Sequence, residues 1–161
     1  MDSSMLVLFL FAFALHNAEE AVWLIRQSSS LKVNLHQSVT QDQFLFGLLW
    51  VTGLACLITA LYIFLPHHEI LKYAYFGYVG TMILNVLFPH LISTMIERSY
   101  SPGLFTGILF LIPINSLIIK MGLDTNTITS VQLIVSTLVV TLFLAASIPL
   151  SFWLGRKLIT Y

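Results

Sequence analysis

Charged residues are scarce in this sequence, and their scarcity decides the class of protein. Of 161 residues, 9% are charged and 58% are hydrophobic, and the mean hydropathy is +0.92. Soluble domains carry about 25% charged residues, so the composition excludes a soluble globular domain and indicates an integral membrane protein. Seven Lys and Arg balance seven Asp and Glu. With no excess of basic residues, we expect no nucleic-acid partner.

Cysteine is also nearly absent. The single cysteine, Cys56, has no partner in the chain, which excludes an intrachain disulfide and a CxxC metal knuckle. Because it lies in an apolar run, we expect a buried, unreactive thiol. The opening stretch MDSSMLVLFLFAFA has no Lys or Arg, unlike the start of a secretory signal peptide, and we interpret it as part of a retained first span.

Long hydrophobic windows are abundant by contrast. A helix needs about 20 apolar residues to cross a bilayer core, and windows of that kind occur five times. They cover approximately residues 4–25, 43–65, 71–97, 102–120 and 130–154. Little remains for a soluble domain. The sequence therefore predicts an all-α, polytopic membrane protein, with five transmembrane helices in one domain over residues 1–161.

The distribution of basic residues predicts an orientation. Lys and Arg accumulate on the cytoplasmic side of membrane proteins. If the N-terminus is outside, Lys72 and Lys120 face outward, and the inner side receives Arg26, Lys32, Arg98, Arg156 and Lys157. This imbalance favours an arrangement with the N-terminus out and the C-terminus in.

Local signals predict where the third and fourth helices begin, pack and bend. Ser101 is a natural N-cap for the fourth helix, and Gly103 and Gly107 form a GxxxG pair, a pattern typical of close helix packing in membranes. Pro89 and Pro113 fall inside the third and fourth windows. We expect both prolines to loosen or kink these helices, because proline removes a backbone donor.

The first helix carries a costly polar cluster in the stretch LHNAEEAVW. An ionisable side chain at the centre of a membrane helix costs about 2.5–3.5 kcal/mol even on lenient insertion scales. His16, Glu19 and Glu20 stand at i, i+3 and i+4, so all three can address one point. A cluster of this kind favours a functional site over isolated side chains that reach for the interface.

The third helix carries polar residues that should lie at a similar depth. Asn85 is near mid-membrane, and His90, Thr94 and Glu97 follow along one stripe. The first and third helices run in the same direction, and the fourth begins near Ser101 on the same side. We therefore expect a shared site in the inner half of the membrane.

Simpler interpretations stay open for several of these residues. Glu20 could pair with Arg26, Asn85 could make a helix-to-helix hydrogen bond, and Glu97 and Arg98 could be the solvated end of their helix. Three further histidines are expected to lie away from the site. His67 and His68 are expected in an exposed turn on the outer side, and nothing fixes His36 near the cluster.

The sequence resembles the HXXEE family of small bacterial membrane proteins, a domain of unknown function. HNAEE at residues 16–20 matches the motif that names the family, and NVLFPH followed by RSYSPGLFTGILFLIP resembles a second block. The resemblance implies a location in the bacterial cytoplasmic membrane. It also implies a set of motif positions, namely His16, Glu19, Glu20, Asn85, His90, Tyr100, Pro102, Gly103 and Thr106.

The residue types favour a divalent metal site. An imidazole and a carboxylate at i and i+4 can bind one ion from a single helix. We expect His16, Glu20 and His90 as ligands, with an open fourth position as in catalytic zinc sites. Glu19 would be the general base, and Asn85 would bind a ligand or a developing oxyanion. Zinc is the expected metal, with iron and manganese open.

These roles predict a membrane-embedded, metal-dependent hydrolase or transferase that takes a lipid or lipidated substrate from the inner leaflet. A metal-free peptidase that uses Glu and His is an alternative by analogy of residue types. A proton-coupled carrier, whose symmetry a homodimer could supply, is another. An accessory membrane subunit, in which the cluster only holds helices together, is the third.

Overall fold

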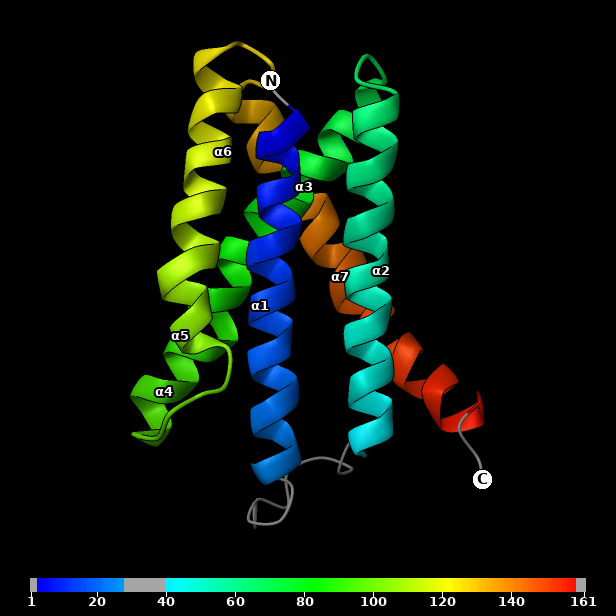
Figure 1. The fold of residues 1–161 in the computed structure, drawn as a ribbon, viewed down its shortest axis with the longest axis vertical. Coiled ribbons are helices and arrows are strands. Elements are labelled where there is room, and N and C mark those ends of the chain that lie inside the picture. The colour runs from blue at the N-terminus through cyan, green and yellow to red at the C-terminus, as the bar shows by residue number, and fades with distance from the viewer. Residues whose placement is uncertain (1–2, 28–39, 159–161) are drawn as a thin grey trace.

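The computed structural model describes residues 3–27 and 40–158, and all of the regular structure in that part of the chain is helical (Figure 1). Five helices are long and apolar enough to cross a membrane. They run over Ser3–Trp23, Gln41–Phe64, Glu69–Glu97, Leu104–Asp124 and Ser130–Leu158, within a few residues of the expected windows. The expectations for Lys32, for His36 and for the side chain of Arg26 lie outside the described residues.

Three of the five spans are single helices and two are segmented. The first, second and fifth spans are α1 (Ser3–Gln27), α2 (Gln41–Phe64) and α7 (Ser130–Leu158). The third consists of α3 (Glu69–Asn85), a wide turn η1 (Val86–Leu91) and α4 (Ile92–Glu97). The fourth consists of α5 (Leu104–Thr106), a wide turn η2 (Gly107–Leu111) and α6 (Ile112–Asp124).

Both segmented spans loosen next to a proline, as expected. In η1 the backbone of Phe88, directly before Pro89, is extended, with φ −138° and ψ 116°, a conformation that proline imposes on the residue before it. In the fourth span the wide turn η2 ends just before Pro113, where the proline ring would clash with the turn before it. The break at Phe88 changes the direction in which the polar residues after it point.

Two expectations about the start of the fourth span are corrected. Ser101 is not the N-cap, because the helix begins at Leu104 with Gly103 in the cap position, at φ +90°. Gly103 therefore lies outside the helix and does not take part in helix packing. Gly107, the other glycine of the GxxxG pair, does. A Cβ on Gly107 would lie 2.7 Å from Val86 Cγ1, so the close packing expected of Gly107 is confirmed.

Buried tyrosines tie the central helix α3 to its neighbours. Tyr75 donates a hydrogen bond to the carbonyl oxygen of Leu6 in α1 (3.0 Å), and Tyr78 donates one to that of Val51 in α2 (2.7 Å). The ring of Phe9 packs edge-on against Tyr75 and Tyr78, with both centroid distances 5.8 Å. Buried phenols need such partners, and each bond contributes about 0.5–1.5 kcal/mol.

Helix α7 crosses the bundle from α3 to α2. In its first half it touches α3, where the hydroxyl of Thr81 lies 3.0 Å from that of Thr141. In its second half it touches α2, where a Cβ on Gly47 would lie 2.4 Å from the ring of Phe152. Figure 1 shows α7 passing behind α2 and its C-terminal part continuing at an angle to that helix. The crossing leaves a wedge between α2, α3 and α7.

The expectation of a buried cysteine is wrong, since Cys56 is exposed on α2. Helix α2 is apolar on its outer side as well as on its packed side, as membrane helices are. Apolar neighbours in the sequence therefore did not distinguish a residue facing the bundle from one facing outward.

Helices α3 and α7 are in close contact. We therefore expect a larger side chain at this contact to destabilise the bundle. A Cβ on Gly77 would lie 2.5 Å from the backbone oxygen of Ser136, so Gly77→Ala should lower the free energy of unfolding by about 1–3 kcal/mol. The measurement is a reversible unfolding titration in mixed micelles. Gly53→Ala is the matched control, because nothing lies within 4 Å of its Cβ. Equal stability of the two variants would contradict the packing.

Candidate metal centre

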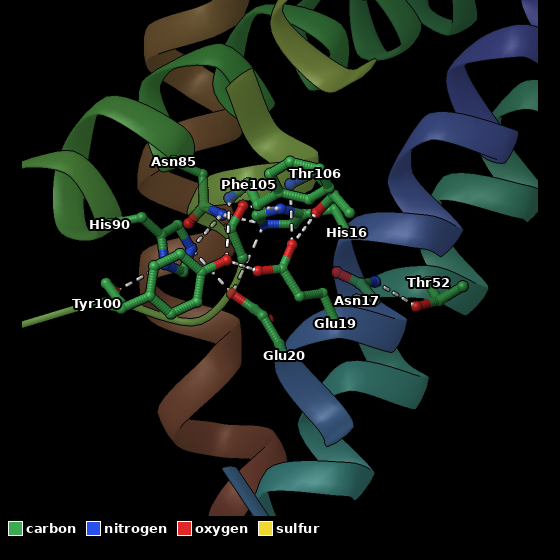
Figure 2. Close-up of polar contacts among 12 residues, drawn as sticks. His16, Asn17, Glu19, Glu20, Thr52, Asn85, His90, Tyr100, Phe105 and Thr106 are labelled. Carbon is green, nitrogen blue, oxygen red and sulfur yellow. Dashed lines mark hydrogen bonds and ion pairs between the residues drawn. The ribbon is translucent and has the colours of Figure 1, made fainter. Parts of the chain in front are cut away.

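Three side chains from two separate spans converge at the centre of Figure 2. His16 and Glu20 come from α1, and His90 comes from the break in the third span. Glu20 Oε1 lies 2.8 Å from His90 Nε2 and 3.6 Å from His16 Nε2, and all three atoms lie within 4.8 Å of one another. His16 is 0% exposed and His90 is 7% exposed. The expectation that these three residues meet is therefore confirmed.

A backbone carbonyl fixes the orientation of His16. Its Nδ1 lies 2.9 Å from the carbonyl oxygen of Gly103, which can only accept a hydrogen bond. Nδ1 must therefore carry the proton, and in the neutral ring Nε2 presents a lone pair toward Glu20. A histidine that binds a metal is held in this way in most known sites. The ring also leaves no room on Gly103, where a Cβ would lie 2.8 Å from Cε1.

The turn before the fourth span also holds His90. The Nδ1 atom of His90 lies 3.3 Å from Ser101 Oγ, and the backbone N–H of Ser101 donates to Thr94 Oγ1 at 3.0 Å. The break at Phe88 turns His90 inward, where it is buried while Phe88 itself is 68% exposed. One short turn, Ser101 to Gly103, thus contacts both imidazoles on the side away from Glu20.

Glu19 lies at the N-terminus of the fourth span, apart from the other three side chains. Its Oε2 accepts hydrogen bonds from the backbone N–H of Thr106 (2.8 Å) and from the hydroxyl of Thr106 (2.6 Å). Its Oε1 accepts a hydrogen bond from the hydroxyl of Tyr100, and the N–H of Phe105 donates to that same hydroxyl at 3.2 Å. A carboxylate in this position is favoured by the positive end of the helix dipole. This geometry favours a positioning role for Glu19.

Asn85 completes the cluster from the end of α3. Its Nδ2 lies 3.3 Å from His16 Nε2 and 3.4 Å from His90 Nε2. The amide thus approaches the same point as the carboxylate of Glu20. Its position matches the expected contact with a ligand, and it adds a polar group that can either donate or, after rotation, accept.

Two of the three distances between the ligand atoms suit a small divalent cation. Ligand bonds of about 2.0–2.1 Å in a tetrahedral zinc site place neighbouring donor atoms roughly 3.3 Å apart. The two distances from Glu20 Oε1, 2.8 and 3.6 Å, lie on either side of that value. Two imidazoles and one carboxylate are also the ligand set of many catalytic zinc sites. Asn85 and the cavity described below lie next to these side chains.

Other residues singled out in the sequence lie away from the centre. Glu97 and Arg98 are exposed at the end of α4, and His67 and His68 are exposed in the turn between α2 and α3. Asn17 has a partner that the sequence did not indicate, since its Nδ2 donates to Thr52 Oγ1 at 2.7 Å. The contact between Ser101 and His90 was also missed, because a serine in a turn gives no signal of its target.

The fold and the site define a class: a helical protein with five candidate membrane spans and a cluster of two buried histidines with a half-buried Glu and Asn. A family model described as "Protein of unknown function with HXXEE motif" matches residues 7–118, and the chain belongs to this family. It is 42% identical over 149 residues to the "Uncharacterized protein YrkK" of Bacillus subtilis (strain 168), covering 92% of this chain and 94% of that protein. No solved structure matches the chain significantly.

The contact between Glu19 and Thr106 predicts a measurable coupling. Glu19→Gln and Thr106→Val should each destabilise the protein, and the double variant should lose less than the sum. Charge-assisted bonds are worth about 1.5–3 kcal/mol, so we expect a coupling of about 1 kcal/mol or more in unfolding titrations. Thr129→Val, on an exposed residue before α7, is the control that should be additive with Glu19→Gln. If the effects of Glu19→Gln and Thr106→Val on stability were additive, the contact between these two residues would not anchor the start of the fourth span.

Proposed function

We propose that His16, Glu20 and His90 bind one divalent cation, and that the protein is a membrane-embedded, metal-dependent hydrolase or transferase. The observation that carries the proposal is the convergence of two buried imidazoles and one half-buried carboxylate, with the proton of His16 held on the opposite nitrogen by Gly103. Zinc is the metal that this ligand set suits best. The cation would supply a Lewis acid that polarises a substrate carbonyl or phosphoryl oxygen.

The side chains around the proposed cation have separate roles in the proposed reaction. Glu20 lines the cavity whereas Glu19 is not among its lining residues. If Oε1 of Glu20 binds the cation, its second carboxylate oxygen is the group that would take a proton from an attacking water or alcohol. Asn85 Nδ2 is placed to donate to an oxygen that gains charge in the transition state. Glu19 then acts indirectly, by fixing the turn that orients both histidines.

The substrate proposed for this site is a lipid or a lipidated peptide. A reaction centre that is buried among apolar helices is reached most directly by molecules dissolved in the bilayer. With the N-terminus outside, as the basic residues favour, the centre lies in the inner half of the bacterial cytoplasmic membrane. The substrate would then enter from the inner leaflet.

A metal-free mechanism is the second candidate, and one contact favours it. His90 Nε2 and Glu20 Oε1 lie 2.8 Å apart, the distance of a direct hydrogen bond. A Glu and His pair in direct contact could activate water without a metal, with Asn85 stabilising the oxyanion. Metal content separates the two candidates.

Purified protein should contain close to one divalent metal per chain by elemental analysis, and His16→Ala and His90→Ala should each lose it, because each removes one of three ligands. His67→Ala and His68→Ala, in the exposed turn between α2 and α3, are matched controls and should keep the metal. Wild-type protein that is folded and free of metal, even after zinc, iron or manganese is supplied, would overturn the metal proposal in favour of the second candidate.

The turn at Ser101 predicts a graded effect on the same measurement. Ser101→Ala removes the hydroxyl that faces His90 Nδ1, and loss of such outer contacts costs about 10–100-fold in metal affinity. Competition with a chelator of known affinity measures the change. Ser130→Ala, at the start of α7, removes a hydroxyl from an exposed position and should leave the affinity unchanged. Equal affinity in the two variants would show that the turn does not support the site.

A further inference from the structure

One cavity connects the candidate centre with the apolar surface of the bundle. Its volume is about 780 Å³, within the range of about 300–1,000 Å³ typical of sites that hold one small ligand. Its walls are mostly apolar side chains of α2, η1 and α7. Its polar lining comes from Asn17, Glu20, Thr81, Asn85, His90, Ser93, Ser101 and Thr141. The lining is therefore that of a site for an amphipathic molecule.

The course of the helices explains why the cavity exists. Helix α7 contacts α3 at Thr141 and α2 at Ser151 and Phe152, and Leu144, Ala145 and Ile148 line the cavity between these contacts. On the opposite wall, the break at Phe88 interrupts the third span. Helix α7 and the third span would otherwise pack side by side, and they are thus held apart here.

The cavity is open toward the side of the bundle. Among its lining residues, Leu84 is 41% exposed, Leu87 is 40% exposed and Phe88 is 68% exposed, and Ala145 on the facing wall is also exposed. In a bilayer this side meets lipid chains. Apolar walls that open sideways at that depth favour hydrocarbon over water.

We propose that the cavity holds one hydrocarbon chain of a membrane lipid, with the carbonyl or phosphate oxygens of the headgroup at Glu20, Asn85 and His90. This inference rests on the proposed function for its chemistry, since a bound cation gives the polar end a net positive charge that suits those oxygens. A second chain of the same lipid would stay outside, in the bilayer. The polar end and the apolar walls together select a lipid over a purely apolar molecule.

The test uses the full-length protein in vesicles of phosphatidylethanolamine and phosphatidylglycerol. A trace of phosphatidylglycerol with a diazirine in one acyl chain is the probe, and mass spectrometry maps its crosslinks after irradiation. Crosslinks should concentrate on the apolar lining residues Leu84, Leu87, Phe88, Leu144, Ala145 and Ile148. Excess unlabelled phosphatidylglycerol should suppress them, whereas labelling of the outer face of α2, including Leu49 and Leu57, should stay proportional to probe concentration.

A pair of variants on α7 gives the matched control. Ala145→Phe places a ring in the cavity and should reduce these crosslinks about tenfold, as a loss of about 1.4 kcal/mol in binding requires. Ala146→Phe adds the same ring at an adjacent exposed position that does not line the cavity and should leave them unchanged. If Ala145→Phe does not fold, Ala145→Leu replaces it.

Metal analysis of the same samples separates this inference from the proposed function. Saturable crosslinks in protein without metal would leave the lipid site standing and overturn the metal proposal. Metal-containing protein with uniform, unsaturable crosslinks would overturn the lipid site alone.

Discussion

The carboxylate of Glu19 at the N-terminus of the fourth span is the interaction on which the rest of the site depends. It fixes Tyr100 and Thr106, which stand on either side of the turn from Ser101 to Gly103. That turn supplies the carbonyl that orients His16 and the hydroxyl that faces His90. Helix N-termini in membranes need partners for their first N–H groups. An acidic residue that supplies one also holds the adjacent turn in place.

The two adjacent glutamates thus have different environments although they share a helix. Glu19 is surrounded by donors from the fourth span, and Glu20 faces two imidazoles and the cavity. Their divergence follows from the helix, where consecutive side chains project about 100° apart. A sequence with only one of them would lose either the anchor or the ligand, which gives a physical reason for an adjacent acidic pair.

Much of the fold followed from the sequence, because five apolar windows and two internal prolines are strong signals in a membrane protein. The meeting of His16, Glu20 and His90 followed from helix direction and depth. The different contacts of Glu19 and Glu20 did not follow from the sequence, because they depend on how the turn before the fourth span folds. Helix starts favour anions in general, and the sequence predicted such a start near Ser101. It could not show that Glu19 of the same chain takes that place, which leaves the fourth span with fewer free donors for a substrate anion.

This occupancy changes where a substrate can approach. Because Glu19 accepts from the N–H and the hydroxyl of Thr106, the fourth span does not present its start to the cavity as an anion site. Most of the polar groups that line the cavity belong instead to the first and third spans and to the turn at Ser101, and α7 adds Thr141. In the proposed complex a headgroup would be bound from the side on which α7 leaves α3. The break at Phe88 then has two effects. It turns His90 toward Glu20, and it opens the wall through which a lipid chain can reach both.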